Sequence, residues 1–159
     1  MQREEIIKKL KLTPLAEEGG YYRQTWVSDI EFNKKPLGTA IYFLLDNSFE
    51  GFSALHTLAS PEIYHFYLGD PLQLNLFYKN GEVGQIIMGH DILNGELPQY
   101  VVPSGVIQGS KIITGGSFAL IGTTMSPGFT LDDFYLNSRE EMFKQYPDYK
   151  NLIISLSRE

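Results

Sequence analysis

The sequence contains no cysteine, which excludes a disulfide framework, a thiolate metal site and a cysteine nucleophile. It also lacks any apolar run near the length of about twenty residues that spans a bilayer. The chain opens on the polar and charged residues Gln2, Arg3 and Glu4, where a signal peptide would place its apolar segment. These absences predict a cytoplasmic protein without a membrane partner.

Positive charge is also scarce. Thirteen Lys and Arg stand against nineteen Asp and Glu, which gives a net charge of −6, and the basic residues are scattered along the chain. Because a nucleic-acid phosphate backbone requires a basic face, no nucleic-acid partner is expected. The apolar fraction of 43% and the charged fraction of 20% are typical of a globular protein. With 159 residues, the chain has the length of one domain with a core of its own.

Aromatic residues are abundant, with ten Tyr, ten Phe and one Trp, and they favour strands and barrel interiors. Short apolar segments bounded by turn residues predict strands. These segments are residues 40–45, 62–68, 72–78, 83–88, 99–102, 107–113 and 117–125. Many short strands with helices only near the ends indicate an all-β sandwich or barrel with minor α content.

Two terminal helices and one hairpin are predicted from local signals. Residues 4–12 have apolar side chains at helical spacing before Pro14, and residues 137–146 begin with a capping box formed by Ser138 and Glu141. Within residues 72–88, the pair Asn80-Gly81 supplies the positive backbone dihedral angles that a tight hairpin turn requires.

Two motifs lie on either side of that hairpin. The first contains Gly51, His56, Glu62 and Gly69, and it resembles the first cupin motif. The second, Pro103-x-Gly105-x-x-Gln108, resembles the second cupin motif, which normally ends in histidine. Further segments resemble the Cupin_5 family, and the likeness runs from about Leu12 to Leu136. The segments that carry it are residues 18–25, 39–45, 62–71, 101–105 and 126–129.

The resemblance implies a single cupin domain over residues 1–159, folded as a double-stranded β-helix or jelly-roll barrel with short N- and C-terminal helices. It also implies a homodimer, which the aromatic excess and the apolar segment 40–45 favour independently, because pairing removes exposed strand edges. A general likeness to dTDP-sugar epimerases and to other sugar-nucleotide isomerases follows from the superfamily.

The sequence departs from the family pattern at three places. Tyr64 stands where the family has Trp, and Gln24 stands where it has Glu. The triplet Ala16-Glu17-Glu18 replaces His-Pro-Glu before the pair Gly19-Gly20, which permits a tight turn and lacks the following helix of a phosphate loop. Because these differences surround one predicted pocket, the family resemblance does not identify a substrate.

The resemblance places the metal-ligand positions of cupins at His56, Leu58, Glu62 and Gln108. Leu58 cannot bind a metal, and a neutral amide is a poor ligand for a transition metal. We therefore predict no cofactor and a hydrogen-bonded cluster of His56, Glu62 and Gln108 inside the barrel. A divalent metal held by these three side chains and water is the alternative.

His56 is the predicted catalytic base. Leu55-His56 resembles the pair that carries the base in dTDP-sugar epimerases, and a free histidine titrates at about pH 6.5. Because side chains alternate along a strand, Tyr64 shares the face of Glu62, and we predict that it returns a proton from the opposite side. By the same alternation His65 faces away and is structural or interfacial. Asp132-Asp133 could orient His56, although a solvated loop pair is the simpler interpretation.

The predicted ligand is a small, polar, anionic metabolite bound in the barrel. Arg23 beside Tyr22 would hold its anionic group, with Glu62 and Gln108 as further binding residues, because a guanidinium matches carboxylate or phosphate in two-point contact. A surface salt bridge of Arg23 is the alternative. Three functions stay open at this point: a sugar-nucleotide epimerase or isomerase, a non-catalytic binding protein, and a metal-dependent cupin enzyme.

Overall fold

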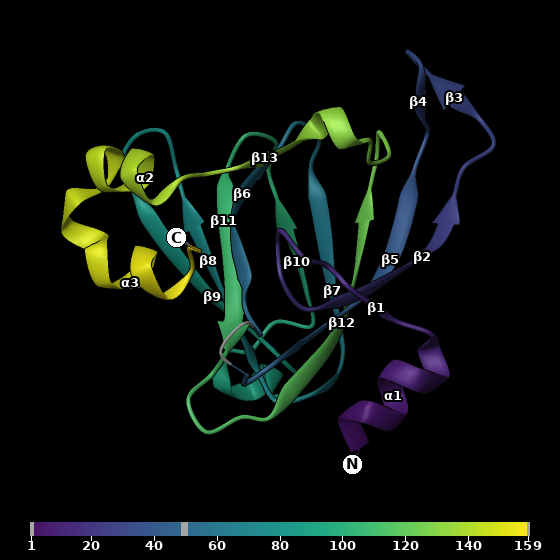
Figure 1. Ribbon diagram of the computed structural model, residues 1–159, viewed down its shortest axis with the longest axis horizontal. Coiled ribbons are helices and arrows are strands. Elements are labelled where there is room, and N and C mark those ends of the chain that lie inside the picture. The colour runs from purple at the N-terminus through teal and green to yellow at the C-terminus, as the bar shows by residue number, and fades with distance from the viewer. Residues whose placement is uncertain (1, 49–50, 159) are drawn as a thin grey trace.

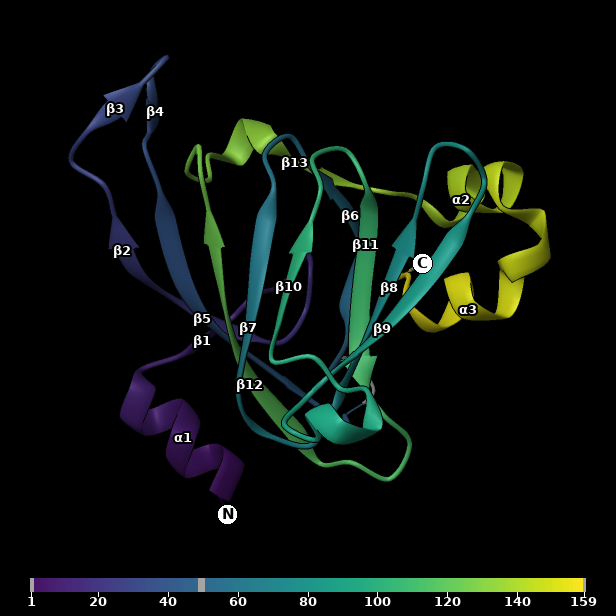
Figure 2. The ribbon, with the colours of Figure 1, turned by 180° about the vertical axis from the view of Figure 1, so that it is seen from behind.

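Two antiparallel sheets face each other in the computed structural model, which describes residues 2–48 and 51–158 (Figures 1 and 2). The larger sheet has the strand order β1 (Thr13–Pro14), β2 (Tyr21–Val27), β5 (Thr39–Asp46), β12 (Phe118–Met125), β7 (Glu62–Gly69), β10 (Gln99–Val102). The smaller has the order β13 (Phe134–Leu136), β6 (Ser53–Leu58), β11 (Ile107–Ile112), β8 (Leu72–Phe77), β9 (Val83–Met88). This arrangement is the predicted jelly roll, and each of the seven predicted segments forms a strand.

The inner faces of the two sheets form one core. Along β7, the side chains of Glu62, Tyr64 and Phe66 are buried, whereas Ile63 and His65 are only half-buried. This confirms the predicted alternation. Core side chains from both sheets pack against these residues, with Phe43 and Ile121 on one side and Leu74 and Leu76 on the other. The core fills the barrel beyond Tyr64 and leaves the end near Glu62 for a cavity.

The helices lie outside the barrel. The apolar side chains of α1 (Gln2–Leu10) pack on Leu44 and Leu120, on the outer face of the larger sheet. At the other end of the chain, α2 (Arg139–Gln145) and α3 (Lys150–Ser155) bury Met142 and Ile153 against the smaller sheet. The predicted helices correspond to α1 and α2, whereas α3 was not predicted. No helix in the described ranges combines the length and apolarity required to cross a membrane.

Capping and turn signals differ in how well they predicted the backbone. The Ser138–Glu141 capping box is confirmed in both directions, since the side chains accept from the Glu141 and Ser138 backbone N–H groups. The β8–β9 turn is wider than predicted. The Tyr78 N–H donates to the Glu82 carbonyl at 2.9 Å, and Gly81, with φ 89°, has positive φ whereas Asn80 does not. A wider loop needs only one left-handed residue.

A hairpin formed by β3 (Glu31–Phe32) and β4 (Lys35–Pro36) was not predicted, and it projects beyond the end of the barrel (Figures 1 and 2). We call residues 26–37 the arm. Five large apolar side chains of the arm are exposed: Trp26, Val27, Ile30, Phe32 and Leu37. Strands β1, β2, β6 and β13 were also absent from the predicted segments.

Candidate functional site

The two cupin-like motifs meet inside the barrel. Strand β6 carries His56, and β11 pairs with it so that Gln108 stands opposite His56. Gln108 Nε2 donates to Glu62 Oε2 at 2.8 Å, which connects the smaller sheet to β7 of the larger one. All three side chains are buried. The predicted cluster is therefore confirmed in part: Gln108 and Glu62 are hydrogen-bonded, and His56 lies opposite Gln108 without a hydrogen bond to either side chain.

The orientation of His56 is fixed on two sides. Its Nδ1 lies 2.7 Å from the carbonyl oxygen of Ala54, and its ring stacks on Phe134 with 5.3 Å between the ring centroids. Because a carbonyl only accepts, Nδ1 must carry hydrogen, and Nε2 of the neutral ring keeps its lone pair. No residue of the described ranges hydrogen-bonds to Nε2. Nε2 of His56 can therefore accept a hydrogen bond or a proton from a ligand.

The prediction that Asp132-Asp133 could orient His56 is wrong. Asp133 pairs with Lys35 and accepts hydrogen bonds from the backbone N–H and side chain of Thr130. Those partners hold the pKa of the Asp133 carboxyl below its ordinary value, against the opposing effect of burial. Asp132 is exposed. The backbone carbonyl of Ala54 orients the imidazole instead.

Glu62 is a buried acid in an apolar setting. Burial raises the pKa of its carboxyl, and the nearby Glu18 charge raises it further. The charge of His56 and hydrogen bonds from Thr123 and Gln108 act in the opposite direction, but burial is the largest effect. Glu62 is consequently able to hold a proton at a pH where an exposed glutamate has lost it.

His56 and Glu62 lie in the wall of a cavity of about 510 Å³. Most of the wall is apolar, and its polar groups are a few carboxyl, hydroxyl, amide and imidazole groups. The lining residues are Leu15, Ala16, Glu17, Glu18, Tyr22, Gln24, Thr39, Ile41, His56, Leu58, Glu62, Thr123, Met125, Phe129, Leu131 and Phe134. Among these described residues there are three glutamates and no Lys or Arg. This charge balance argues against the predicted anionic ligand.

Arg23 lies outside this cavity. Its neighbours Tyr22 and Gln24 line the cavity, so alternation turns Arg23 to the outer face of the sheet. There the guanidinium lies 5.4 Å from the ring centroid of Tyr42. The prediction that Arg23 and His56 share one pocket is wrong, while Tyr22 does line the cavity as expected.

Tyr64 also differs from the prediction. It faces inward, but its side chain is 1% exposed and belongs to the core, and it is not among the residues that line the cavity. Burial raises the pKa of its hydroxyl far above the ordinary value, and the Glu62 and Glu18 charges add to this effect. Tyr64 therefore lies in the core next to Glu62 and is poorly placed to return a proton to a ligand in the cavity.

His65 faces outward, as predicted. Its Nε2 lies 2.9 Å from Thr124 Oγ1, and its Nδ1 lies 3.3 Å from Gln99 Nε2. Partial burial lowers its pKa. These partners connect β7 to the strands on either side of it, which is a structural role.

Glu18 was not predicted as a site residue. Ser53 Oγ donates to its Oε1 at 2.6 Å, and the following Gly19 and Gly20 have positive φ of 108° and 71°. A Cβ on Gly20 would lie 2.6 Å from Leu45 and 2.7 Å from the Leu44 carbonyl. Glycine is therefore required for this turn, which brings Glu18 to the cavity. The sequence signal that could have identified Glu18 is its position directly before the pair Gly19-Gly20.

The donor set does not fit a cupin metal centre. Leu58 lines the cavity at one ligand position, and Gln108 directs its amide nitrogen at Glu62. In the part of the chain that the structure describes, no three His, Asp or Glu side chains are grouped so that they could hold a metal ion.

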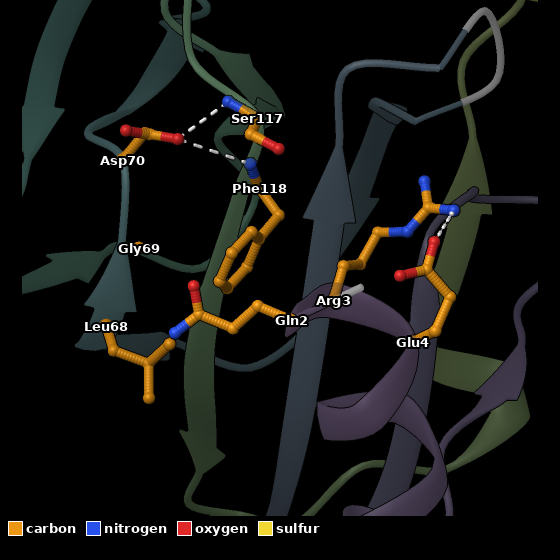
Figure 3. A pocket seen from close by; sticks show the side chains of 8 residues that line it. All are labelled: Gln2, Arg3, Glu4, Leu68, Gly69, Asp70, Ser117 and Phe118. Atoms are coloured by element: carbon orange, nitrogen blue, oxygen red, sulfur yellow. Dashed lines mark hydrogen bonds and ion pairs between the residues drawn. The ribbon is translucent and has the colours of Figure 1, made fainter.

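A second hollow, of about 690 Å³, lies at the opposite end of β7 from Glu62 (Figure 3). Its charged side chains are already paired. Asp70 accepts hydrogen bonds from the backbone of Ser117 and Phe118, and Arg3 pairs with Glu4 and Asp46. None of the predicted site residues lines this hollow, which lies between the start of α1 and the end of β7.

Comparisons with known proteins agree with this architecture. The profile of Cupin_5, described as cupin superfamily (DUF985), matches residues 4–137. The uncharacterized protein YML079W of Saccharomyces cerevisiae is 29% identical over 79% of this chain and 71% of its own length.

Two solved structures are similar over nearly their whole length. Protein SO0799 from Shewanella oneidensis is 38% identical, with a TM-score of 0.91 over 98% of this chain and 96% of that one. A hypothetical protein from Leishmania major is 31% identical, with a TM-score of 0.91 over 98% of both chains. Oxalate decarboxylase of Bacillus subtilis, at 15% identity and a TM-score of 0.58 over 93% of this chain and 38% of its own, shares the fold alone.

Proposed function

The chain belongs to the Cupin_5 family of the cupin superfamily, and from this membership and its cavity we propose that it binds a small organic molecule inside the barrel. The observation that carries the proposal is the cavity of about 510 Å³ next to His56 and Glu62. Small-molecule sites are concave and mostly apolar, with a few polar groups that orient the ligand. This cavity has both properties.

A side chain that fills the cavity is expected to prevent binding. Leu58 lines the cavity and is buried, so Leu58→Trp places an indole in the space. We expect native mass spectrometry to show a small molecule retained by the wild-type chain and lost from the variant. The overpacking itself costs about 1–3 kcal/mol, which a thermal melt will reveal.

Leu93→Trp is the matched control, because Leu93 is 98% exposed and lies outside the cavity. It should retain the same molecule as the wild type. A molecule that stays bound in Leu58→Trp would place the binding site elsewhere and contradict the proposal.

Proton transfer on a carbonyl compound is the second candidate function, and the His56–Glu62 pair favours it. His56 Nε2 has a free lone pair, while burial keeps Glu62 a weak acid. His56 would remove a proton from carbon, and Glu62 would donate its proton to the carbonyl oxygen that becomes negative. This is the chemistry of an isomerase or epimerase.

The finer prediction of a sugar-nucleotide substrate has less support. The nucleoside diphosphate group of such a substrate would have to lie beside Glu17, Glu18 and Glu62, in a cavity whose described lining has no Lys or Arg. Arg23, which was expected to bind the phosphates, faces the opposite side of its sheet. An uncharged keto-sugar fits this lining better than its nucleotide.

We also propose that the chain forms a homodimer through the arm. Trp26, Ile30 and Phe32 are 53%, 62% and 58% exposed on a hairpin that projects away from its own barrel (Figure 1). The arm also carries exposed charges of both signs, Glu31 and Lys34, which can pair across a twofold axis. The arm of a second copy of the chain could therefore pack against this apolar surface and bury it.

Light scattering of the wild-type chain is expected to give twice the chain mass of 18.1 kDa. Phe32→Glu places a charge in the proposed contact and should give the single-chain mass at the same concentration. Leu93→Glu, which changes an exposed apolar residue outside the arm, should remain dimeric. A wild-type mass near 18.1 kDa at micromolar concentration would disprove the dimer.

A further inference from the structure

We propose that the cavity recognises an organic cation, a primary ammonium group carried on an apolar body. The proposal rests on the proposed binding function and specifies the chemical class of the ligand. It follows from three features of the cavity: an unpaired hydrogen-bond acceptor on His56, carboxyl groups without Lys or Arg partners among the described residues, and aromatic walls.

The polar end of the cavity has more acceptors than donors. His56 lines the cavity, its Nδ1 hydrogen is donated to the Ala54 carbonyl, and its Nε2 has no hydrogen-bond partner among the described residues. Gln108, 1% exposed, donates from Nε2 to Glu62 and has a buried Oε1 without a partner, but it is not among the residues that line the cavity. A ligand with an N–H donor at this end would give His56 Nε2 the hydrogen-bond partner that it lacks.

The carboxyl groups also lack ion pairs with Lys or Arg among the described residues. Within the described ranges, no Lys or Arg lies within ion-pair distance of Glu62, although its side chain is 93% buried. Glu18 lies close enough to raise the pKa of Glu62, which means that the two carboxyl groups disfavour each other's ionisation. A bound ammonium group would relieve both the repulsion and the cost of burying an unpaired carboxylate.

The walls suit the remainder of such a molecule. Tyr22, Phe129 and Phe134 bring aromatic rings to the cavity, and a ring face attracts a cation that approaches it. Ile41, Met125 and other apolar lining side chains would hold an apolar body. An ammonium group at the His56–Glu62 end therefore leaves the rest of the ligand in apolar surroundings.

Three probes that share one aromatic body test the charge preference: 2-phenylethylamine, 2-phenylethanol and phenylacetate. Binding is measured at pH 8 by titration of methyl-labelled protein, with the signals of Ile41, Leu58 and Met125 as cavity reporters. Charge-assisted hydrogen bonds are stronger than neutral ones, so we expect the amine to bind about tenfold more tightly than the alcohol. Phenylacetate should bind most weakly.

Two glutamate variants locate the origin of the preference. Glu62→Gln should reduce the advantage of the amine over the alcohol to less than about twofold, because the charged partner of the ammonium group is lost. Glu82→Gln makes the same chemical change on an exposed residue of the β8–β9 turn and should keep the wild-type preference.

The possible failures are distinguishable. If the alcohol or phenylacetate binds at least as tightly as the amine, the cation proposal is overturned and the binding function stands. An amine advantage that persists in Glu62→Gln overturns the recognition by Glu62. If none of the three probes shifts the cavity methyl signals, the cation proposal is overturned, and a small molecule retained in native mass spectrometry would still support the binding function.

Discussion

Replacement of His56 by Asn is expected to slow solvent deuterium exchange into a keto-sugar by about 10²–10⁴-fold, the usual contribution of a positioned general base. The Ala54 carbonyl fixes hydrogen on Nδ1, so Nε2 is the basic atom, and His56 lines the cavity. Asparagine retains an N–H that can donate to Ala54 but has no basic nitrogen. The variant should therefore keep the local structure and lose the base.

The measurement follows deuterium at the carbon next to the carbonyl, by mass spectrometry, for keto-sugars with and without a nucleotide. His65→Asn is the matched control, because His65 lies on the outer face of the same barrel and contacts Thr124 there. It should exchange at the wild-type rate. Equal rates in wild type and His56→Asn would exclude His56 as the base and leave a binding protein.

The parts of the fold that could be predicted are those in which local signals agree with tertiary packing. Strand β9 was predicted at residues 83–88 and β10 at residues 99–102, which are the observed bounds. The Ser138–Glu141 box was found because capping is a local hydrogen-bond pattern that needs no distant partner. The cluster of His56, Glu62 and Gln108 was found through motif spacing, because those positions are opposite one another in the cupin barrel.

The parts that could not be predicted depend on direction and depth. Both faces of β2 carry aromatic and polar residues, so its sequence does not indicate that Tyr22 faces the cavity and Arg23 faces outward. Alternation placed Tyr64 on the correct face, but two residues advance a strand by about 6.6 Å, and this step takes Tyr64 from the cavity into the core. Glu18 reaches the site through a loop, which has no periodicity to read.

The pH dependence of stability gives a direct test of the environment assigned to Glu62. Burial raises the pKa of its carboxyl above the ordinary value of 4.5. The folded protein therefore binds this proton more tightly than the unfolded chain. The stability that Glu62 contributes is complete below the unfolded value and is lost as pH rises through the folded value. Every tenfold difference in proton affinity between the two states costs about 1.4 kcal/mol of stability above that window.

Glu62→Gln abolishes the loss of stability that Glu62 causes at high pH, because an amide does not ionise. Its carbonyl oxygen can still accept the hydrogen bond from Gln108 Nε2, so the two proteins should have similar unfolding free energies at about pH 4. As pH rises to about 8, the variant should become the more stable protein, and the difference between their free energies of unfolding should widen by about 1.4 kcal/mol for each tenfold difference in proton affinity. The groups that face Glu62, namely His56 and Glu18, are unchanged in the comparison. Urea unfolding at several pH values measures this difference in the free energy of unfolding, with Glu82→Gln as the control. If the wild-type chain instead gains stability over the variant as pH rises, Glu62 is ionised and well paired in the folded barrel.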